Sequence, residues 1–133
     1  MDISLNAKAL SKRDNARIER RLVATLTDAC ETAKSEIPGF EWLTHTVDYA
    51  AFPQSLRVTW VFDTRASQNH ALASGFDQRM RELTGDALQQ ADVPAVQLDR
   101  CVHVDSEQAC QSQHGGDWRV RLARGASAVR PVR

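Results

Sequence analysis

The sequence predicts a two-layer α+β sandwich, in which two long helices cover one face of a mixed, four-stranded sheet. Two observations lead to this prediction. Two segments place apolar residues at the three- and four-residue spacing of a helix buried on one side. Other segments alternate apolar and polar residues, as half-buried strands do. Because the helices and the sheet each have one apolar face, we expect the two layers to bury these faces against each other.

The first long helix is predicted to begin near Asp14 and to stop at Pro38-Gly39, because proline cannot continue a helix and glycine takes the turn. Its apolar residues share one face. They are Ile18, Leu22, Leu26, Cys30, Ala33 and Ile37. Cys30 belongs to this stripe, so we interpret it as a small buried side chain rather than a reactive thiol.

Two strands are predicted next, over residues 42–49 and 56–63, with a hairpin loop around Pro53 between them. His45 shares the apolar face of the first strand with Leu43 and Val47, which favours a core histidine over a catalytic one. In the second strand one face consists of Leu56, Val58, Trp60 and Phe62.

A second long helix is predicted after the cap candidates Asp63-Thr64 and Ser67, and it ends before Pro94. Gly85 is expected to bend or split this helix, since a glycine within a helix costs roughly 1 kcal/mol relative to alanine. We assign its apolar stripe to the core. This stripe is Leu72, Phe76, Met80, Leu83, Ala87 and Leu88.

The C-terminal third predicts a strand over 96–104, a short helix, and a fourth strand over 118–122. Asp105 and Gln108 have capping-box spacing for the short helix, which Gly115-Gly116 would end. In the last strand Trp118, Val120 and Leu122 alternate with Arg119 and Arg121. We therefore predict one domain over 13–123, with flexible basic ends at 1–12 and 124–133.

The predicted element order is helix, strand, strand, long helix, strand, short helix, strand. It matches a circularly permuted ferredoxin-like fold, and its first five elements also match a KH-like core. Such an analogy of fold carries no function.

The chain has 133 residues, of which 42% are apolar and 26% charged, and this is ordinary usage for one globular domain. No segment resembles a signal peptide or a membrane span. The cysteines Cys30, Cys101 and Cys110 cannot all pair with one another, and free thiols indicate a reducing compartment. We expect a cytoplasmic protein with no membrane partner.

The formal net charge of zero conceals an uneven distribution. Residues 1–27 carry six bases and three acids, residues 28–117 six bases and fourteen acids, and residues 118–133 five bases and no acid. Two basic ends therefore flank an acidic body. Such a distribution is typical of a solvated surface, but it also occurs in proteins that bind an anionic partner, such as nucleic acid or an acidic protein surface. The candidate nucleic-acid-binding residues are Lys12, Arg13, Arg17, Arg20, Arg21, Arg119, Arg121 and Arg124.

Two thiols and two imidazoles lie within fourteen residues, at Cys101, His103, Cys110 and His114. Tetrahedral zinc accepts two cysteines and two histidines, so these four residues are a candidate metal site. Their spacing is not a common zinc pattern, because no ligand pair comes from a tight knuckle. The alternative is a buried Cys110 with exposed histidines, and no cofactor.

Two segments resemble a family of small uncharacterised bacterial proteins. These proteins share a WLTH-x-VDY-x-x-FP-x-SL core and a DSE-x-x-C…GG-x-W ending, and the resemblance covers residues 16–122. Such proteins are sometimes labelled Fis-family transcriptional regulators, which implies a C-terminal helix-turn-helix that binds DNA. The C-terminal third here predicts strand, short helix, strand and tail, so the sequence does not support that label. The family supplies no catalytic residues.

Standard catalytic and phosphate-binding motifs do not occur in the sequence, nor does the GxxG loop of nucleic-acid-binding KH domains. The sequence therefore favours a binding or regulatory module, associated with nucleic acid through its basic ends. Two alternatives remain open. One is a protein-interaction module stabilised by the Cys/His site, and the other is a small enzyme that uses His45 with Asp48 or the Cys101 cluster with Asp99.

Overall fold

A three-stranded sheet forms the centre of the structure, a computed structural model that describes residues 11–94 and 96–129. Its strands are β1 (Phe40–Thr46), β2 (Arg57–Phe62) and β3 (Val102–Ser106), in the spatial order β1-β2-β3. β1 is antiparallel to β2, and β3 is parallel to β2. The mixed sheet of the prediction is therefore confirmed, with three strands instead of four in the described part of the chain.

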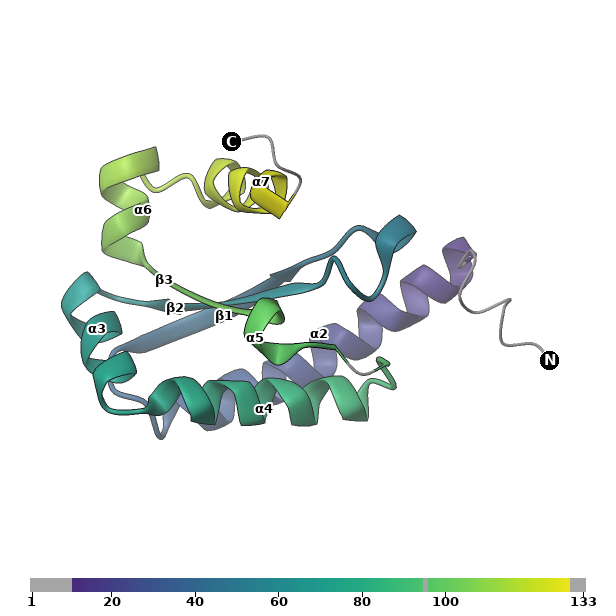
Figure 1. Ribbon diagram of the computed structural model, residues 1–133, viewed down its shortest axis with the longest axis horizontal. Helices are drawn as coiled ribbons and strands as arrows, with labels where there is room; N and C mark the ends of the chain where they lie inside the picture. The colour runs from purple at the N-terminus through teal and green to yellow at the C-terminus, as the bar shows by residue number, and fades with distance from the viewer. Residues whose placement is uncertain (1–10, 95, 130–133) are drawn as a thin grey trace.

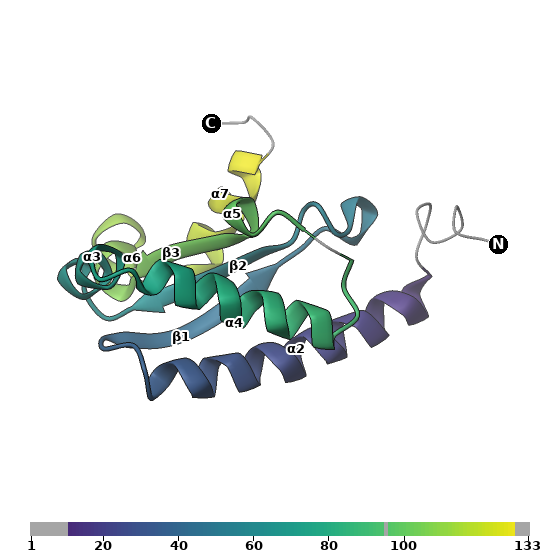
Figure 2. The same cartoon turned by 60° about the horizontal axis from the view of Figure 1, so that its bottom comes forward.

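Two long helices, α2 (Lys12–Lys34) and α4 (Phe76–Gln90), cover one face of this sheet. Figures 1 and 2 show both helices on the same side of the strands, as the predicted sandwich requires. Between them lies a core centred on Trp60 and Phe62 of β2, whose side chains are fully buried. Most of the apolar stripe of each helix points into it. The buried members include Leu22, Leu26, Ala33, Met80 and Leu88. The assignment of Leu72 to the core is wrong, because its side chain is 40% exposed.

The second long helix is divided in two, at a different glycine from the one expected. Helix α3 (Arg65–Ala73) ends at Ser74, and Gly75 starts α4 with a φ of 85°, a conformation that glycine adopts without steric cost. Gly85 does not break α4. A Cβ at Gly85 would lie 3.3 Å from Leu98 Cδ1, so the glycine permits the close approach of the following segment.

The predicted strand over 96–104 is shifted along the chain. A single helical turn, α5 (Leu98–Cys101), occupies its first half, and β3 continues two residues further than expected. Val102 and Val104 nevertheless pack against the core, as predicted, because they pair with Val58 and Trp60 of β2.

The fourth predicted strand is wrong, because residues 118–122 belong to α7 (Trp118–Val129). The Asp117 carboxylate accepts a hydrogen bond from the backbone N–H of Val120 at 3.1 Å, which is the contact of a helix cap. Trp118, Arg121 and Leu122 are half-buried while Arg119 and Val120 are exposed, which is helical rather than alternating burial. The helix also runs into the segment that was predicted to be a flexible tail.

Helix α7 follows α6 (Glu107–His114) across a three-residue turn, so the expectation of a C-terminal third without paired helices is also wrong. The cap of α6 is Ser106, whose hydroxyl accepts from the N–H of Ala109 at 3.0 Å, and not Asp105 as expected. Figure 1 shows α7 on the sheet face opposite to α2 and α4.

The order α2, β1, β2, α3–α4, β3 follows the KH-like alternative. The permuted ferredoxin-like alternative needs a fourth strand, which the described residues do not form.

Candidate functional site

Basic residues line the amino-terminal half of α2, which extends past the end of the sheet in Figure 1. The buried residues of this helix are Leu22, Leu26, Ala29 and Ala33. With 3.6 residues per turn, Arg13, Arg17 and Arg20 lie on the face opposite to that buried stripe. All three are exposed, and we call them the basic face of α2.

The helix begins where it does because Ser11 and Asp14 form a capping box. The Asp14 N–H donates to Ser11 Oγ at 3.0 Å, and the Ser11 N–H donates to Asp14 Oδ2 at 3.3 Å. The bonds from Ser11 lower the pKa of Asp14. A carboxylate in the first turn offsets the repulsion between the positive end of the helix dipole and the surrounding bases.

Two of the predicted basic residues of α2 take part in surface ion pairs. Arg17 Nη2 lies 3.0 Å from Asp14 Oδ1, and Arg21 Nη1 lies 2.9 Å from Asp92 Oδ2. Exposed pairs of this kind contribute little to stability, so little free energy is lost when one of them breaks. Lys12 and Arg20 are exposed and have no ion pair within residues 11–94 and 96–129.

The basic residues of α7 are arranged differently. Arg121 is turned toward the sheet, where Nε and Nη2 donate to both carboxylate oxygens of Asp105, at 2.6 and 2.8 Å. Its side chain is only 15% exposed, and the bonds to Asp105 raise its pKa. Arg121 is therefore a structural residue that anchors α7. Arg119 is exposed, and the side chain of Arg124 lies outside the described part of the chain.

The two basic segments do not come together. Helix α2 packs on the core face of the sheet, whereas Arg121 of α7 holds Asp105, which pairs with Val61 on the other face. Figure 2 shows the sheet between the two helices. Of the candidate nucleic-acid-binding residues, only those of α2 form a continuous exposed surface in the described chain.

The four candidate zinc ligands lie in different surroundings. Cys101 is buried at the end of α5, and its burial raises the pKa of the thiol to about 11. His103 Nε2 is 2.7 Å from the carbonyl oxygen of Arg100, and burial lowers the pKa of this histidine.

Cys110 is fully buried in α6, which raises the pKa of its thiol, and His114 Nδ1 lies 3.1 Å from Arg121 Nη1. No three His, Cys, Asp or Glu side chains of the described residues gather closely enough to hold a metal ion. Zinc stays a prediction, which metal analysis of the purified protein tests.

His45 does not pair with Asp48. Its Nε2 lies 3.1 and 3.0 Å from the two carboxylate oxygens of Glu19 on α2, and the Tyr49 hydroxyl donates to Glu19 Oε1 at 2.6 Å. Asp48 instead caps the short 3-10 helix η1 (Tyr49–Ala51) by accepting from the N–H of Ala50. The contacts of Asp48 are those of a turn-capping residue.

Glu19 and Glu107 were not singled out in the sequence, although each organises a cluster. The two Glu107 oxygens accept from Trp42 Nε1 at 2.7 Å and from Trp118 Nε1 at 2.8 Å. The two indole rings meet edge to face, with centroids 4.9 Å apart. Partners 11 to 65 residues apart leave no local signal, so no spacing rule reveals them.

Comparison of the chain with protein-family models, with curated proteins and with solved structures found no match. Among residues 11–94 and 96–129, no helix is both long and apolar enough to cross a membrane.

Proposed function

We propose that this protein binds nucleic acid through the basic face of α2, without reading its base sequence. The observation that carries the proposal is the row formed by Arg13, Arg17 and Arg20 on the exposed side of a helix that extends past the sheet. Side chains three and four residues apart on a helix are neighbours, so the three guanidinium groups can contact successive phosphates of one strand.

The remaining surface supports the same proposal. Residues 28–117 carry fourteen acids and six bases, so phosphates are repelled from most of the molecule and attracted to one end. Among the described residues, Trp42 and Trp118 donate to Glu107 and meet edge to face, while Trp60 is in the core. With the indoles engaged in this way, contacts to phosphate rather than stacking on bases would dominate the affinity.

The test is fluorescence anisotropy with duplex DNA and with single-stranded RNA, repeated across a salt series. Each phosphate contact contributes roughly 0.7 to 0.9 units to the slope of log affinity against log salt. Arg17→Ala combined with Arg20→Ala should therefore reduce that slope by up to about two units and weaken binding at low salt. The Arg21 ion pair with Asp92 is left intact in this variant.

A matched control removes the same charge elsewhere. Lys34 at the far end of α2 and Arg100 on α5 are both exposed, and neither belongs to the basic face. Lys34→Ala combined with Arg100→Ala should leave the slope close to that of the wild type. The proposal fails if both double variants lose the same affinity. It also fails if the wild type binds both ligands more weakly than roughly 100 μM at low salt, which is weaker than ordinary non-specific binding.

A further inference from the structure

A polar cleft of about 380 Å³ lies where α3, β3, α6 and α7 meet, at the opposite end of the sheet from the basic face of α2. Its polar lining consists of Arg65, Gln68 and Asn69 from α3, Asp105 from β3 and Arg121 from α7. None of these residues serves the core, and only Arg121 belongs to the candidate nucleic-acid residues. The cleft is therefore distinct from both the core and the basic face of α2.

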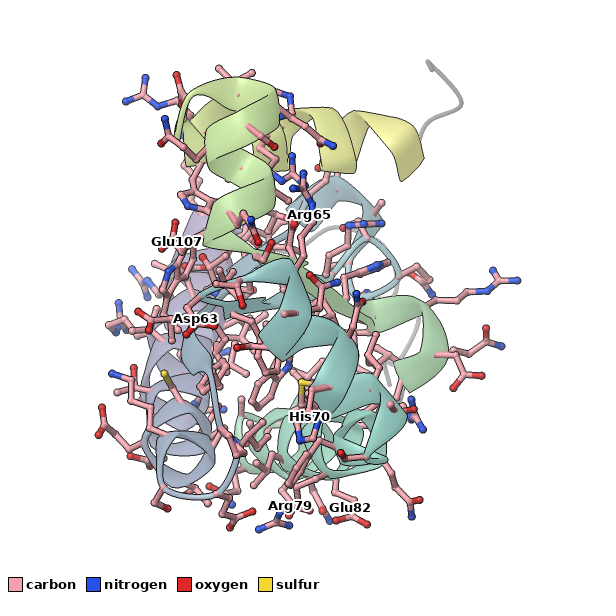
Figure 3. All side chains as sticks on the ribbon, turned by 90° about the vertical axis from the view of Figure 1, so that its left-hand side faces the viewer. Asp63, Arg65, His70, Arg79, Glu82 and Glu107 are labelled. Carbon is pink, nitrogen blue, oxygen red and sulfur yellow. The ribbon has the colours of Figure 1, made fainter. Side chains whose placement is uncertain are left out.

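Helix α6 holds Arg65 in place at two points. The backbone N–H of Arg65 donates to Gln108 Oε1, and its Nη2 donates to Ser112 Oγ, both at 2.8 Å. Gln108 is itself fixed, because its N–H donates to the carbonyl oxygen of Asp63 at 3.1 Å. Figure 3 shows Arg65 between α3 and α6. Arg65 is exposed, and the single bond from its guanidinium group to Ser112 directs the side chain toward α6. A side chain directed in this way loses less entropy when it binds a ligand.

The cleft keeps the positive charge of Arg65. Asp105 is the one carboxylate in its lining, and both of its oxygens accept from Arg121, so this pair is neutral in sum. Arg65 pairs with no carboxylate within residues 11–94 and 96–129, and Nη2 is the only guanidinium nitrogen that donates to a described residue. Its other N–H groups are available to an anion.

Two amide groups extend this set of donors. Gln68 and Asn69 follow Arg65 by three and four residues, which places all three on one side of α3. Neither side-chain amide makes a hydrogen bond to the described residues. The amino end of α3 adds partial positive charge at the same place.

We infer that this cleft binds the phosphate group of a small molecule. The guanidinium group of Arg65 and the amide N–H₂ groups of Gln68 and Asn69 line one cleft, and a phosphate has enough acceptor oxygens for several such donors. A carboxylate has only two oxygens and would leave donors unpaired. This inference is independent of nucleic-acid binding by α2, because the two sites share no residue.

The test is a titration of the full chain with inorganic phosphate, at neutral pH and at an ionic strength held constant with chloride. Side-chain amide signals of Gln68 and Asn69 in ¹H–¹⁵N NMR spectra should shift and saturate. Arg65→Gln should raise the dissociation constant at least tenfold. Arg100→Gln, which removes an exposed base elsewhere, should leave the constant unchanged.

Three results would overturn the inference. The first is a shift that grows linearly without saturation, the second is an unchanged constant in Arg65→Gln, and the third is equal binding of acetate in place of phosphate. If Arg65→Gln loses the native spectrum, Gln68→Ala combined with Asn69→Ala replaces it, with the Arg65 Nε signal as the readout. A saturating phosphate shift that persists unchanged in this double variant would also refute the site.

Discussion

Trp60 places an indole N–H in the centre of the core, and one threonine satisfies it. Trp60 Nε1 donates to Thr84 Oγ1 at 3.1 Å, and Thr84 Oγ1 donates in turn to the Met80 carbonyl oxygen at 2.8 Å. Thr84→Val keeps the shape but leaves the indole unpaired, so it should lower the free energy of unfolding by about 1–3 kcal/mol in urea denaturation. Thr84→Ser keeps the hydroxyl and should cost less. A Thr84→Val variant as stable as the wild type, or a larger loss in Thr84→Ser than in Thr84→Val, would show that the hydrogen bond to Trp60 contributes little.

Glu19 makes the stability of the protein depend on pH in the acid range. Burial alone would raise its pKa, but the hydrogen bonds from Tyr49 and His45 outweigh burial and lower it. A lowered folded-state pKa means that Glu19 contributes stability above its ordinary pKa, and that this contribution disappears as the pH falls through the folded value. Because Glu19 is 44% exposed, we expect a contribution below about 1 kcal/mol.

The Glu19→Gln variant tests this prediction. Its free energy of unfolding should fall less steeply than that of the wild type between about pH 5 and pH 3, and the two proteins should differ most near neutral pH. Glu31→Gln, an exposed substitution on the same helix, is the control. Parallel curves for wild type and Glu19→Gln would mean that Glu19 has no lowered pKa in the folded state.

Residue environments were predictable where they depend on one element and unpredictable where they depend on two. The alternation of β1 correctly places His45 on the core face, but its partner is Glu19, 26 residues earlier on α2. Asp48 is close in sequence and caps η1 instead. For the same reason the spacing of Cys101, His103, Cys110 and His114 could not reveal that one lies in a helical turn and one in a strand.

At the scale of elements, helix α7 is held on the sheet by a small number of contacts around Glu107. Glu107→Ala leaves the indole N–H groups of Trp42 and Trp118 without their acceptor. Hydrogen exchange in α7 should accelerate several-fold, because weakly anchored elements open locally, while exchange in β2 should stay slow. Glu82→Ala, which removes a carboxylate whose one ion pair in the described part of the chain is with Arg79, is the control. Unchanged protection of α7 would assign its anchoring to Arg121 and Asp105 alone.

The type of an element was predictable where its pattern is long or ends in a clear signal, such as Gly115-Gly116 after α6, and it was not predictable where a short pattern fits two structures. Helix α2 and strand β2 have the predicted type, since their patterns extend over many residues or alternate without exception. Residues 118–122 alternate over five positions only, which fits a strand and the first turn of a helix equally well. The cap at Asp117 decides between them, because its carboxylate accepts from the N–H of Val120 in the first turn of α7.

At the scale of the whole molecule, the two basic segments of the sequence lie on opposite faces of the sheet. The two basic ends of the sequence suggest one shared binding surface. In the structure the sheet separates α2 from α7 (Figure 2), and the charge of Arg121 is neutralised by its ion pair with Asp105. The sequence could not predict this, because it depends on which side of the sheet the last helix crosses. The basic face of α2 is then the surface that an anionic polymer would meet first.

This separation makes a prediction that distinguishes a binding face from a general effect of charge. Arg119 on α7 and Arg20 on α2 are both exposed, so replacing either by alanine removes one charge from the same net total. If phosphates contact a face, Arg20→Ala should weaken nucleic-acid binding several-fold at low salt and lower the salt slope by roughly one unit, whereas Arg119→Ala should change neither. Anisotropy titrations of both variants at two salt concentrations are sufficient. Equal losses would mean that the ligand responds to the net charge of the protein, since two residues on opposite faces cannot touch the same short duplex.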